Sequence, residues 1–337
     1  MGPAYVTEDT PPYGVAVEVA PGVRRLVARN PSYFSYHGTG TYIVGRGEVA
    51  VIDAGPRRAD HAEALLAALA GEHVTHQLIT HTHGDHSPAA ATLRDVLGAP
   101  TFGYGPHPAA AGSEADDAFA DLLWGAGDEA EDATWAAAAA DPAAELSAAE
   151  PTAEPTSGEP DEDARPDTDF VPDVTVGHGD VIEGPGFTFE ALHTPGHISN
   201  HLCFAWRDGD ALFSGDHVMG WSTTIIPPPD GGLADYLASL ELLFDRSESR
   251  YFPTHGPSID DPAPFVRQLH AHRHARTRQV LEILGRGPAS IAEIVEVAYV
   301  DVRRELHRPA RRSILSHLFD LERSGAVARE GRSWFLT

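Results

Sequence analysis

Short apolar stretches, each followed by a tight polar turn, recur along the chain. Their length and composition predict strands rather than helices. The turn after each stretch carries a histidine or an aspartate. Because loops at strand ends are where a rigid scaffold presents reactive groups, the pattern predicts an α/β protein with its chemistry at strand ends. The stretches are residues 49–52, 77–80, 187–192, 211–213 and 250–252.

The densest turn is His81-Thr82-His83-Gly84-Asp85-His86, which holds three imidazoles and one carboxylate in six residues. Borderline divalent metals such as zinc prefer imidazole and carboxylate ligands. Residues two apart in an extended segment point the same way, so His81 and His83 can hold one ion. Ser87 is expected to cap a helix over residues 88–98. This cap would place the last two residues of the motif on the preceding turn, facing the first pair.

The other stretches also end near a residue that could join a metal site. Each is an aspartate or a histidine, and both are common ligands of divalent ions. In chain order they are Asp53, His197, Asp216 and His255. The sequence therefore predicts a metal site assembled from several separate turns.

These residues resemble, in order, the five motifs of the metallo-β-lactamase superfamily, and the resemblance covers residues from about 14 to 264 apart from one insertion. It implies a four-layer αβ/βα sandwich with metals at one edge of two sheets. It also implies two zinc ions per chain, although iron and manganese fit the same ligand types. In this reading His81, His83 and His197 hold the first ion, while Asp85, His86 and His255 hold the second.

The resemblance further implies that Asp216 bridges both ions and that a hydroxide between them is the nucleophile. Asp85 and Asp53 are the expected catalytic carboxylates, with Asp53 orienting a metal ligand rather than binding metal itself. Three residues near the site are candidates for contact with the substrate: His37, Trp221 and Ile226.

A segment of low complexity, residues 113–170, separates the second motif from the third. It carries 18 acidic residues and one arginine, a net charge of −17 out of −26 for the chain. Such a composition buries too little apolar surface to order the backbone. We expect a disordered insertion into a catalytic domain of residues 1–264. The alternative is that Phe119, Leu122, Leu123 and Trp124 form a short helix that docks on the protein.

Residues 265–337 form a second predicted domain. Ser290 and Glu293 have the spacing of a capping box, and another helix is expected to begin at Pro309. Residues 326–336 then predict a hairpin, in which Trp334 anchors the wing to the core. This layout resembles the winged-helix domain of the lactamase-β-like branch. The domain has 13 arginines against 8 acidic residues, a net charge of only +5 on a chain of −26.

Composition limits the remaining possibilities. No apolar run reaches the length of a membrane span, and the first residues lack the layout of a signal peptide, so we expect a cytoplasmic protein without membrane contact. Cys203, the single cysteine, is predicted to be a core residue. Three histidines on an arginine-rich helix are expected to be solvated: His270, His272 and His274.

Several function classes fit these observations. The first, which we favour, is a metal-dependent hydrolase of a small ester, thioester or lactone. The second is a metal-dependent endoribonuclease acting on single-stranded RNA, as in some members of the lactamase-β-like branch. A non-catalytic regulator that binds nucleic acid is disfavoured by the complete ligand set. Mono-iron oxygen chemistry on thiols, known in a neighbouring branch, is a fourth class. The sequence predicts no oligomeric state.

Overall fold

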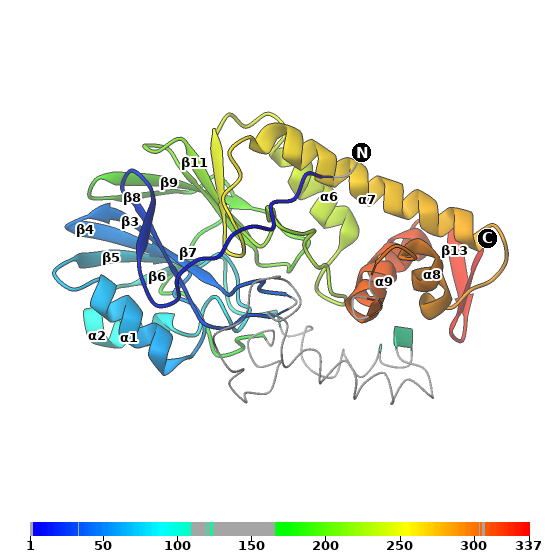
Figure 1. The fold of residues 1–337 in the computed structure, drawn as a ribbon, viewed down its shortest axis with the longest axis horizontal. Helices are drawn as coiled ribbons and strands as arrows, with labels where there is room; N and C mark the ends of the chain where they lie inside the picture. The colour runs from blue at the N-terminus through cyan, green and yellow to red at the C-terminus, as the bar shows by residue number, and fades with distance from the viewer. Residues whose placement is uncertain are drawn as a thin grey trace.

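The computed structural model describes residues 3–32, 34–108, 119, 122–123, 166–302, 304 and 307–337, except for the side chains of 308 and 309. Two β-sheets lie face to face, with helices on their outer faces (Figure 1). The C-terminal helices and hairpin form a smaller unit beside this sandwich, at the end of the long helix α7 (Figure 1). No helix in these ranges is long and apolar enough to span a bilayer.

The first sheet has seven strands in chain order. Its strands are antiparallel from β1 to β4 and parallel from β4 to β7. They are β1 (Val17–Ala20), β2 (Val23–Val27), β3 (Gly40–Arg46), β4 (Glu48–Ile52), β5 (His73–Leu78), β6 (Thr101–Gly103) and β7 (Val174–Thr175).

The second sheet has five strands. The β11–β12 pair is parallel and the others are antiparallel. In spatial order the strands are β12 (Arg250–Pro253), β11 (Ala211–Gly215), β10 (Leu202–Trp206), β9 (Phe187–His193) and β8 (Val181–Gly184). The strands predicted from apolar stretches are all present, and their ends agree with the prediction or differ from it by at most four residues.

Three apolar cores separate four layers. Residues of both sheets, among them Phe189 and Phe213, fill the space between the sheets. Leu65 and Leu93 pack helices α1 (Ala59–Ala68) and α2 (Ala90–Leu97) on the first sheet. Helices α6 (Leu233–Leu242) and α7 (Pro262–Leu284) cover the second sheet. This arrangement confirms the predicted αβ/βα sandwich.

The C-terminal unit also has the predicted layout. It contains α8 (Ile291–Ala298), α9 (His307–Arg323), β13 (Val327–Glu330) and β14 (Ser333–Leu336). The capping box forms, because the Ser290 hydroxyl accepts the backbone N–H of Glu293 and the Glu293 carboxylate accepts the backbone N–H of Ser290. Trp334 is fully buried in the core of this unit, as expected for an anchor of the wing.

Two local expectations are corrected. Helix α2 begins at Ala90 rather than Pro88, and Ser87 does not cap it. The Ser87 hydroxyl instead donates to Asp167, at 2.6 Å, and Ala89 takes the N-cap position. Helix α9 begins two residues before Pro309.

The predicted insertion, residues 113–170, lies mostly outside the described residues, and so does Trp124. Three of the four apolar residues named above are described, and they pack on the C-terminal unit, whereas Phe170 at the end of the segment packs in the core of the first sheet. Leu122 and Leu123 are buried in the core of that unit, and the ring of Phe119 meets Phe319 of α9 edge to face at 5.1 Å. Part of this segment therefore docks on the C-terminal unit, which agrees with the alternative interpretation.

Candidate metal centre

Seven side chains from the ends of several strands converge on one edge of the sandwich. Three groups of donor atoms, each within 4.8 Å of one another, share members and so form one cluster. The groups are His81, His83 and His197; His81, His86 and Asp216; and Asp85, His86 and His255. The structure thus brings together every residue proposed above as a metal ligand.

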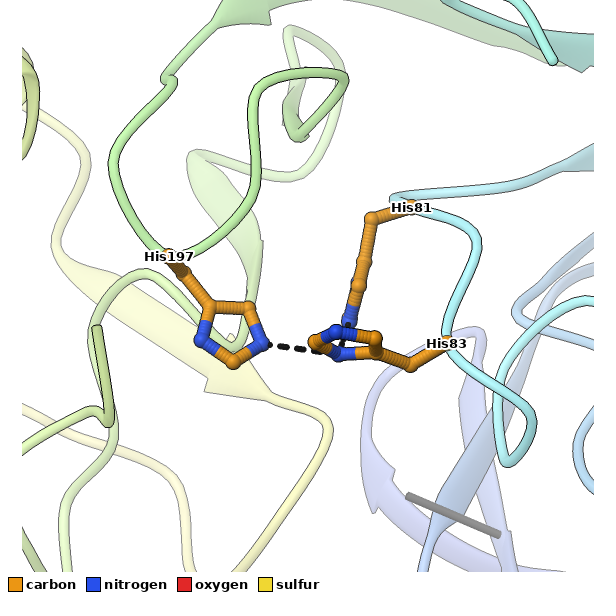
Figure 2. A group of neighbouring side chains, drawn as sticks. All are labelled: His81, His83 and His197. Atoms are coloured by element: carbon orange, nitrogen blue, oxygen red, sulfur yellow. Dashed lines mark hydrogen bonds between the residues drawn. The ribbon is translucent and has the colours of Figure 1, made fainter. Parts of the chain in front are cut away.

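The first group is a triangle of ring nitrogens (Figure 2). His81 Nε2 lies 2.9 Å from His83 Nδ1, which lies 3.0 Å from His197 Nε2. His81 and His83 come from the turn after β5, and His197 comes from the loop after β9. Figure 2 shows the three rings pointing into the same space from these two loops.

The second group lies on the other side of Asp216. His255 Nε2 is 3.3 Å from the Asp85 carboxylate and 3.4 Å from Oδ1 of Asp216. The other oxygen of Asp216 is 3.6 Å from His197 Nε2 and 3.7 Å from His86 Nε2. Asp216 therefore faces both groups, which is the position that a bridging ligand requires.

Hydrogen bonds fix the histidine rings from behind. Nδ1 of His86 donates to Asp53 at 2.9 Å, and Nδ1 of His197 donates to the Ile225 carbonyl at 2.5 Å. Nδ1 of His255 faces the Gly38 carbonyl at 3.3 Å. Because these partners only accept hydrogen bonds, each Nδ1 carries a proton and each Nε2 faces the cluster, where a bound cation would take the place of a second proton.

The pKa values of the histidines differ between the two sides of the cluster. Burial, aided by neighbouring imidazoles, lowers the pKa of His81 and His83 well below the ordinary value. These rings are therefore neutral and offer lone pairs. Burial also opposes a charge on His255, but Asp216 and Asp85 outweigh it and raise the pKa of His255 to about 10. The carboxylate half of the cluster thus attracts positive charge.

Buried atoms without partners test whether a metal fits here. Within the described residues, His86 Nε2 and Asp216 Oδ1 are buried and accept or donate no hydrogen bond. Each atom has only ion-pair neighbours at 3.4 Å or more, His86 Nε2 beside Asp85 and Asp216 Oδ1 beside His255, and both atoms face the cluster. A cation among these nitrogens and oxygens would satisfy them, so the residues fit a metal ion.

Sequence reasoning missed the residues that support the cluster from outside. The Thr39 hydroxyl donates to Asp85 at 2.7 Å. The Thr224 hydroxyl donates to the Asp216 carbonyl, and the Thr224 carbonyl accepts from the guanidinium of Arg273. Arg273 lies on α7 and is only 4% exposed. No local pattern marks these residues, because each partner lies far away along the chain or on a different element.

Two of the three residues predicted to contact the substrate lie beside the cluster, and the third lies in the core. Trp221 stacks on Tyr36, with ring centroids 4.8 Å apart, and the ring of His37 lies 4.1 Å from that of Tyr36. These rings lie beside the cluster, since His255 contacts the Gly38 carbonyl and Gly256 abuts Trp221. Ile226 is instead 1% exposed and belongs to the core beneath the second sheet, so it cannot contact a substrate. That prediction is wrong, because the chain turns Ile226 inward while the Ile225 carbonyl holds His197.

Other histidines near the cluster have structural roles. His201 is fully buried, and its Nε2 accepts the backbone N–H of Asp216 at 3.1 Å. His217 is buried against Tyr236, with ring centroids 4.9 Å apart. Cys203 is buried in β10 and its thiol has a raised pKa of about 12, chiefly because of burial. It is therefore the core residue that the sequence predicted.

Comparisons with known proteins agree with this geometry. Residues 37–255 match the family model of the metallo-beta-lactamase superfamily, and residues 290–334 match that of the beta-lactamase associated winged helix domain. The lactamase-like protein ptaB of Pestalotiopsis fici is 26% identical over 97% of this chain and 90% of its own length. An atrochrysone carboxyl ACP thioesterase of Aspergillus chevalieri is 27% identical, with the same coverage of 97% and 90%.

A solved structure shows the same fold over the whole length. A metallo-beta-lactamase family protein from Thermus thermophilus superposes with a TM-score of 0.66 and 25% identity, covering 95% of this chain and all of that one (100%). The superfamily model alone spans more than half of the chain. The chain therefore belongs to the metallo-beta-lactamase superfamily, carries the associated winged-helix domain, and is a metal-dependent hydrolase.

Proposed function

We propose that this hydrolase is a dinuclear zinc enzyme that cleaves a small ester, thioester or lactone, with a thioester as the favoured substrate. In this proposal His81, His83 and His197 hold one ion, and Asp85, His86 and His255 hold the other. The observation that carries it is the placement of Asp216, whose two carboxylate oxygens face the two groups. A cluster for a single ion would need no carboxylate between two sets of ligands.

Held by these residues, two divalent ions would supply an acidified water as the nucleophile and would polarise the carbonyl oxygen of the substrate. The chain contributes the positions of its ligands. Asp53, Ile225 and Gly38 each hold the back of one histidine ring, so that the free nitrogen points into the cluster. Hydrogen bonds of this kind preorganise a metal site and tune its affinity.

Two observations favour a thioester with an organic acyl group. The relative from Aspergillus chevalieri is named as an acyl-carrier thioesterase, and the alignment covers nearly all of this chain. Beside the cluster, the half-buried ring of Trp221 stacks on the buried ring of Tyr36 and presents its own aromatic face. An aromatic surface binds planar or apolar groups well and offers no charge for a phosphate chain.

The charges of the winged helix argue against RNA as the substrate. Arg311 is 8% exposed and donates to the Leu123 carbonyl at 3.0 Å. Arg329 of β13 pairs with Glu322 at 3.4 Å. These arginines serve contacts within the chain, and a chain of net charge −26 repels a polyanion at long range.

We also propose that the two domains meet within α7 rather than at residue 264. Phe265 and Leu269, near the start of α7, pack in the core under the second sheet. Val280 and Leu284, near its end, pack in the winged-helix core. One continuous helix therefore belongs to both domains.

A paired assay tests the proposed function. Zinc-loaded full-length protein would be offered a panel of acyl thioesters and, separately, a fluorescent single-stranded RNA. We expect thioester hydrolysis that is lost in His83→Ala and Asp216→Ala and kept in His73→Ala, which removes an exposed imidazole away from the cluster. RNA cleavage that is lost in the same two variants, without any thioester hydrolysis, would refute the proposal.

A further inference from the structure

A buried threonine inside the metal-binding turn meets three other parts of the chain. Thr82 stands between two of the proposed metal ligands and is 1% exposed. Its hydroxyl accepts a hydrogen bond from Nδ2 of Asn200 at 2.8 Å and lies 2.9 Å from Nδ1 of His107. Its carbonyl accepts the backbone N–H of Asp167 at 2.8 Å. Segments that are distant in the sequence therefore hold this turn from several sides.

Asn200 joins the two loops that carry the first group of ligands. It follows His197 by three residues in the loop between β9 and β10, and its amide bonds the turn through Thr82. A second bond joins the same loops, because the backbone N–H of Leu202 donates to the Thr80 carbonyl at 2.7 Å. One link is thus made by the backbone, and the other is made by the Asn200 side chain.

The hydrogen bonds of Asn200 are uneven. The residue is 4% exposed, so its amide depends on partners inside the protein. Nδ2 donates to Thr82 and, at 3.3 Å, to the Pro106 carbonyl. Oδ1 is buried and has no hydrogen-bond partner among the residues that the structure describes. Since a buried carbonyl oxygen without a partner is costly, packing alone gives no reason for an amide here. The bond to Thr82 is the contribution that accounts for it.

Asp167, near the end of the predicted insertion, holds the same turn from the other side. Its backbone N–H donates to the Thr82 carbonyl, and its carboxylate accepts the Ser87 hydroxyl at 2.6 Å. The preceding residue, Pro166, forms an isolated antiparallel bridge with His83. One short segment therefore spans the motif from end to end. With the turn fixed in this way, the Asn200 bond helps to determine where the loop of His197 lies relative to it.

The first group needs this spacing to be accurate. Nδ1 of His83 and Nε2 of His197 are 3.0 Å apart although 114 residues separate them, and their rings approach from two different loops (Figure 2). A tetrahedral zinc ion with Zn–N distances of about 2.0–2.1 Å holds neighbouring nitrogens about 3.3 Å apart. Ligands must be held to within about 0.5 Å of such a geometry, so a small shift of either loop would weaken the site.

We propose that Asn200 is a positioning residue for the metal ion of the first group. Through Thr82 it sets the distance between the loop of His197 and the turn of His83. This role rests on the proposed function, in which the first group holds one of two ions. The second group has its own supports, since Asp53 bonds His86 and Thr39 bonds Asp85. Loss of the Asn200 bond therefore affects chiefly one ion of the two.

The experiment compares zinc binding in full-length variants. Asn200→Leu removes the amide at similar size, Thr82→Val removes the hydroxyl at similar shape, and Thr82→Ser keeps the hydroxyl. The matched control is Gln77→Leu, because Gln77 is a buried amide whose Nε2 donates to the Ala99 carbonyl at 2.7 Å and whose Oε1 also has no partner. Stepwise zinc affinity would be measured by competition with a chromogenic chelator. Urea unfolding of the metal-free protein and thioester hydrolysis would be measured alongside.

We expect Asn200→Leu and Thr82→Val each to weaken one zinc-binding step by about tenfold or more and to leave the other step near the wild type. The double variant should bind zinc no worse than either single variant, because both substitutions remove the same bond. Thr82→Ser should retain wild-type affinity. Gln77→Leu should lose stability in the metal-free protein and keep both zinc steps.

Wild-type zinc affinity in folded Asn200→Leu or Thr82→Val protein would overturn the proposal, and so would an equal loss in Gln77→Leu. If Asn200→Leu does not fold, the contrast between Thr82→Val and Thr82→Ser decides. The zinc titration involves no substrate, so a wild type that binds zinc without hydrolysing thioesters would refute the proposed function and leave this comparison valid. If the wild type takes up a single ion, the dinuclear proposal fails and the variants are compared on that ion.

Discussion

Asp53 offers the sharpest test of how the metal centre is held. Its carboxylate is 1% exposed and accepts four hydrogen bonds. Oδ1 accepts the backbone N–H of Thr80 at 2.8 Å. Oδ2 accepts the Thr80 hydroxyl at 2.8 Å, Nδ1 of His86 at 2.9 Å and the Thr254 hydroxyl at 3.1 Å. Asp53→Asn keeps the size of the side chain but replaces one acceptor by a donor.

The backbone conformation at Asp53 accommodates asparagine without added strain. Asp53 has φ of +51°, in the left-handed region that asparagine tolerates at least as well as aspartate. The amide would turn its NH₂ toward the Thr80 N–H, because that orientation loses one hydrogen bond rather than three. A buried donor without a partner costs about 1–3 kcal/mol. The bond from His86 also loses its charge assistance, and such a loss behind a ligand lowers metal affinity by about 10–100-fold.

The assay separates the two effects. The free energy of unfolding would be measured on metal-free protein by urea denaturation, and zinc affinity would be measured by competition with a chromogenic chelator. Thr101→Val is the matched control, because its buried hydroxyl bonds Asp173 and touches no residue of the cluster. We expect both variants to lose stability and only Asp53→Asn to lose zinc. A folded Asp53→Asn protein with wild-type zinc affinity would refute the role assigned to Asp53.

Three further predictions follow from the site, a buried histidine and the docked segment. Chelation of both ions should abolish hydrolysis and added Zn²⁺ should restore it; activity that survives exhaustive chelation would contradict a metal mechanism. Burial holds the pKa of His317 well below 6.5, so the unfolded chain binds its proton more readily. Its contribution to stability is therefore present above pH 6.5 and is lost as pH falls, by up to about 1.4 kcal/mol per pH unit, and His317→Gln should flatten that slope in urea denaturation at pH 7.5 and 5.5. Leu123→Ala should destabilise the winged-helix unit by about 2–5 kcal/mol in thermal unfolding without changing metal content, and an unchanged transition would show that the docked segment contributes nothing.

The sequence could predict the strands and the cluster because both depend on local patterns. A short apolar run before a polar turn indicates a strand end wherever it occurs, and the motif from His81 to His86 places four candidate ligands in one turn. The distant members, such as His197 and His255, followed from the order of motifs that resembles a known superfamily. The spacing of residues along the chain would not by itself have assigned His197 and His255 to the same metal site as the motif from His81 to His86.

The errors share a physical cause, which is competition from residues far away in the chain. Ser87 had the sequence context of a helix cap, but its hydroxyl donates a hydrogen bond to the carboxylate of Asp167, eighty residues later. Ile226 looked like part of a binding surface, but whether a residue in an irregular loop faces inward depends on what packs behind it. His270 looked solvated until α6 brought Glu241 against it. Periodicity carries no information about such partners.

The winged-helix unit is connected to the metal centre through a continuous chain of contacts. The hydroxyl of Ser313, on α9, lies 3.4 Å from the guanidinium of Arg273, which also donates to the Thr224 carbonyl. Thr224 in turn donates to the Asp216 carbonyl, and the next residue holds His197. Through these contacts α9 helps to hold the loop that carries Thr224 and Ile225, and Arg311 of the same helix bonds the Leu123 carbonyl. The winged-helix domain therefore has a structural role at the metal centre, because it supports the backbone that positions His197 and Asp216.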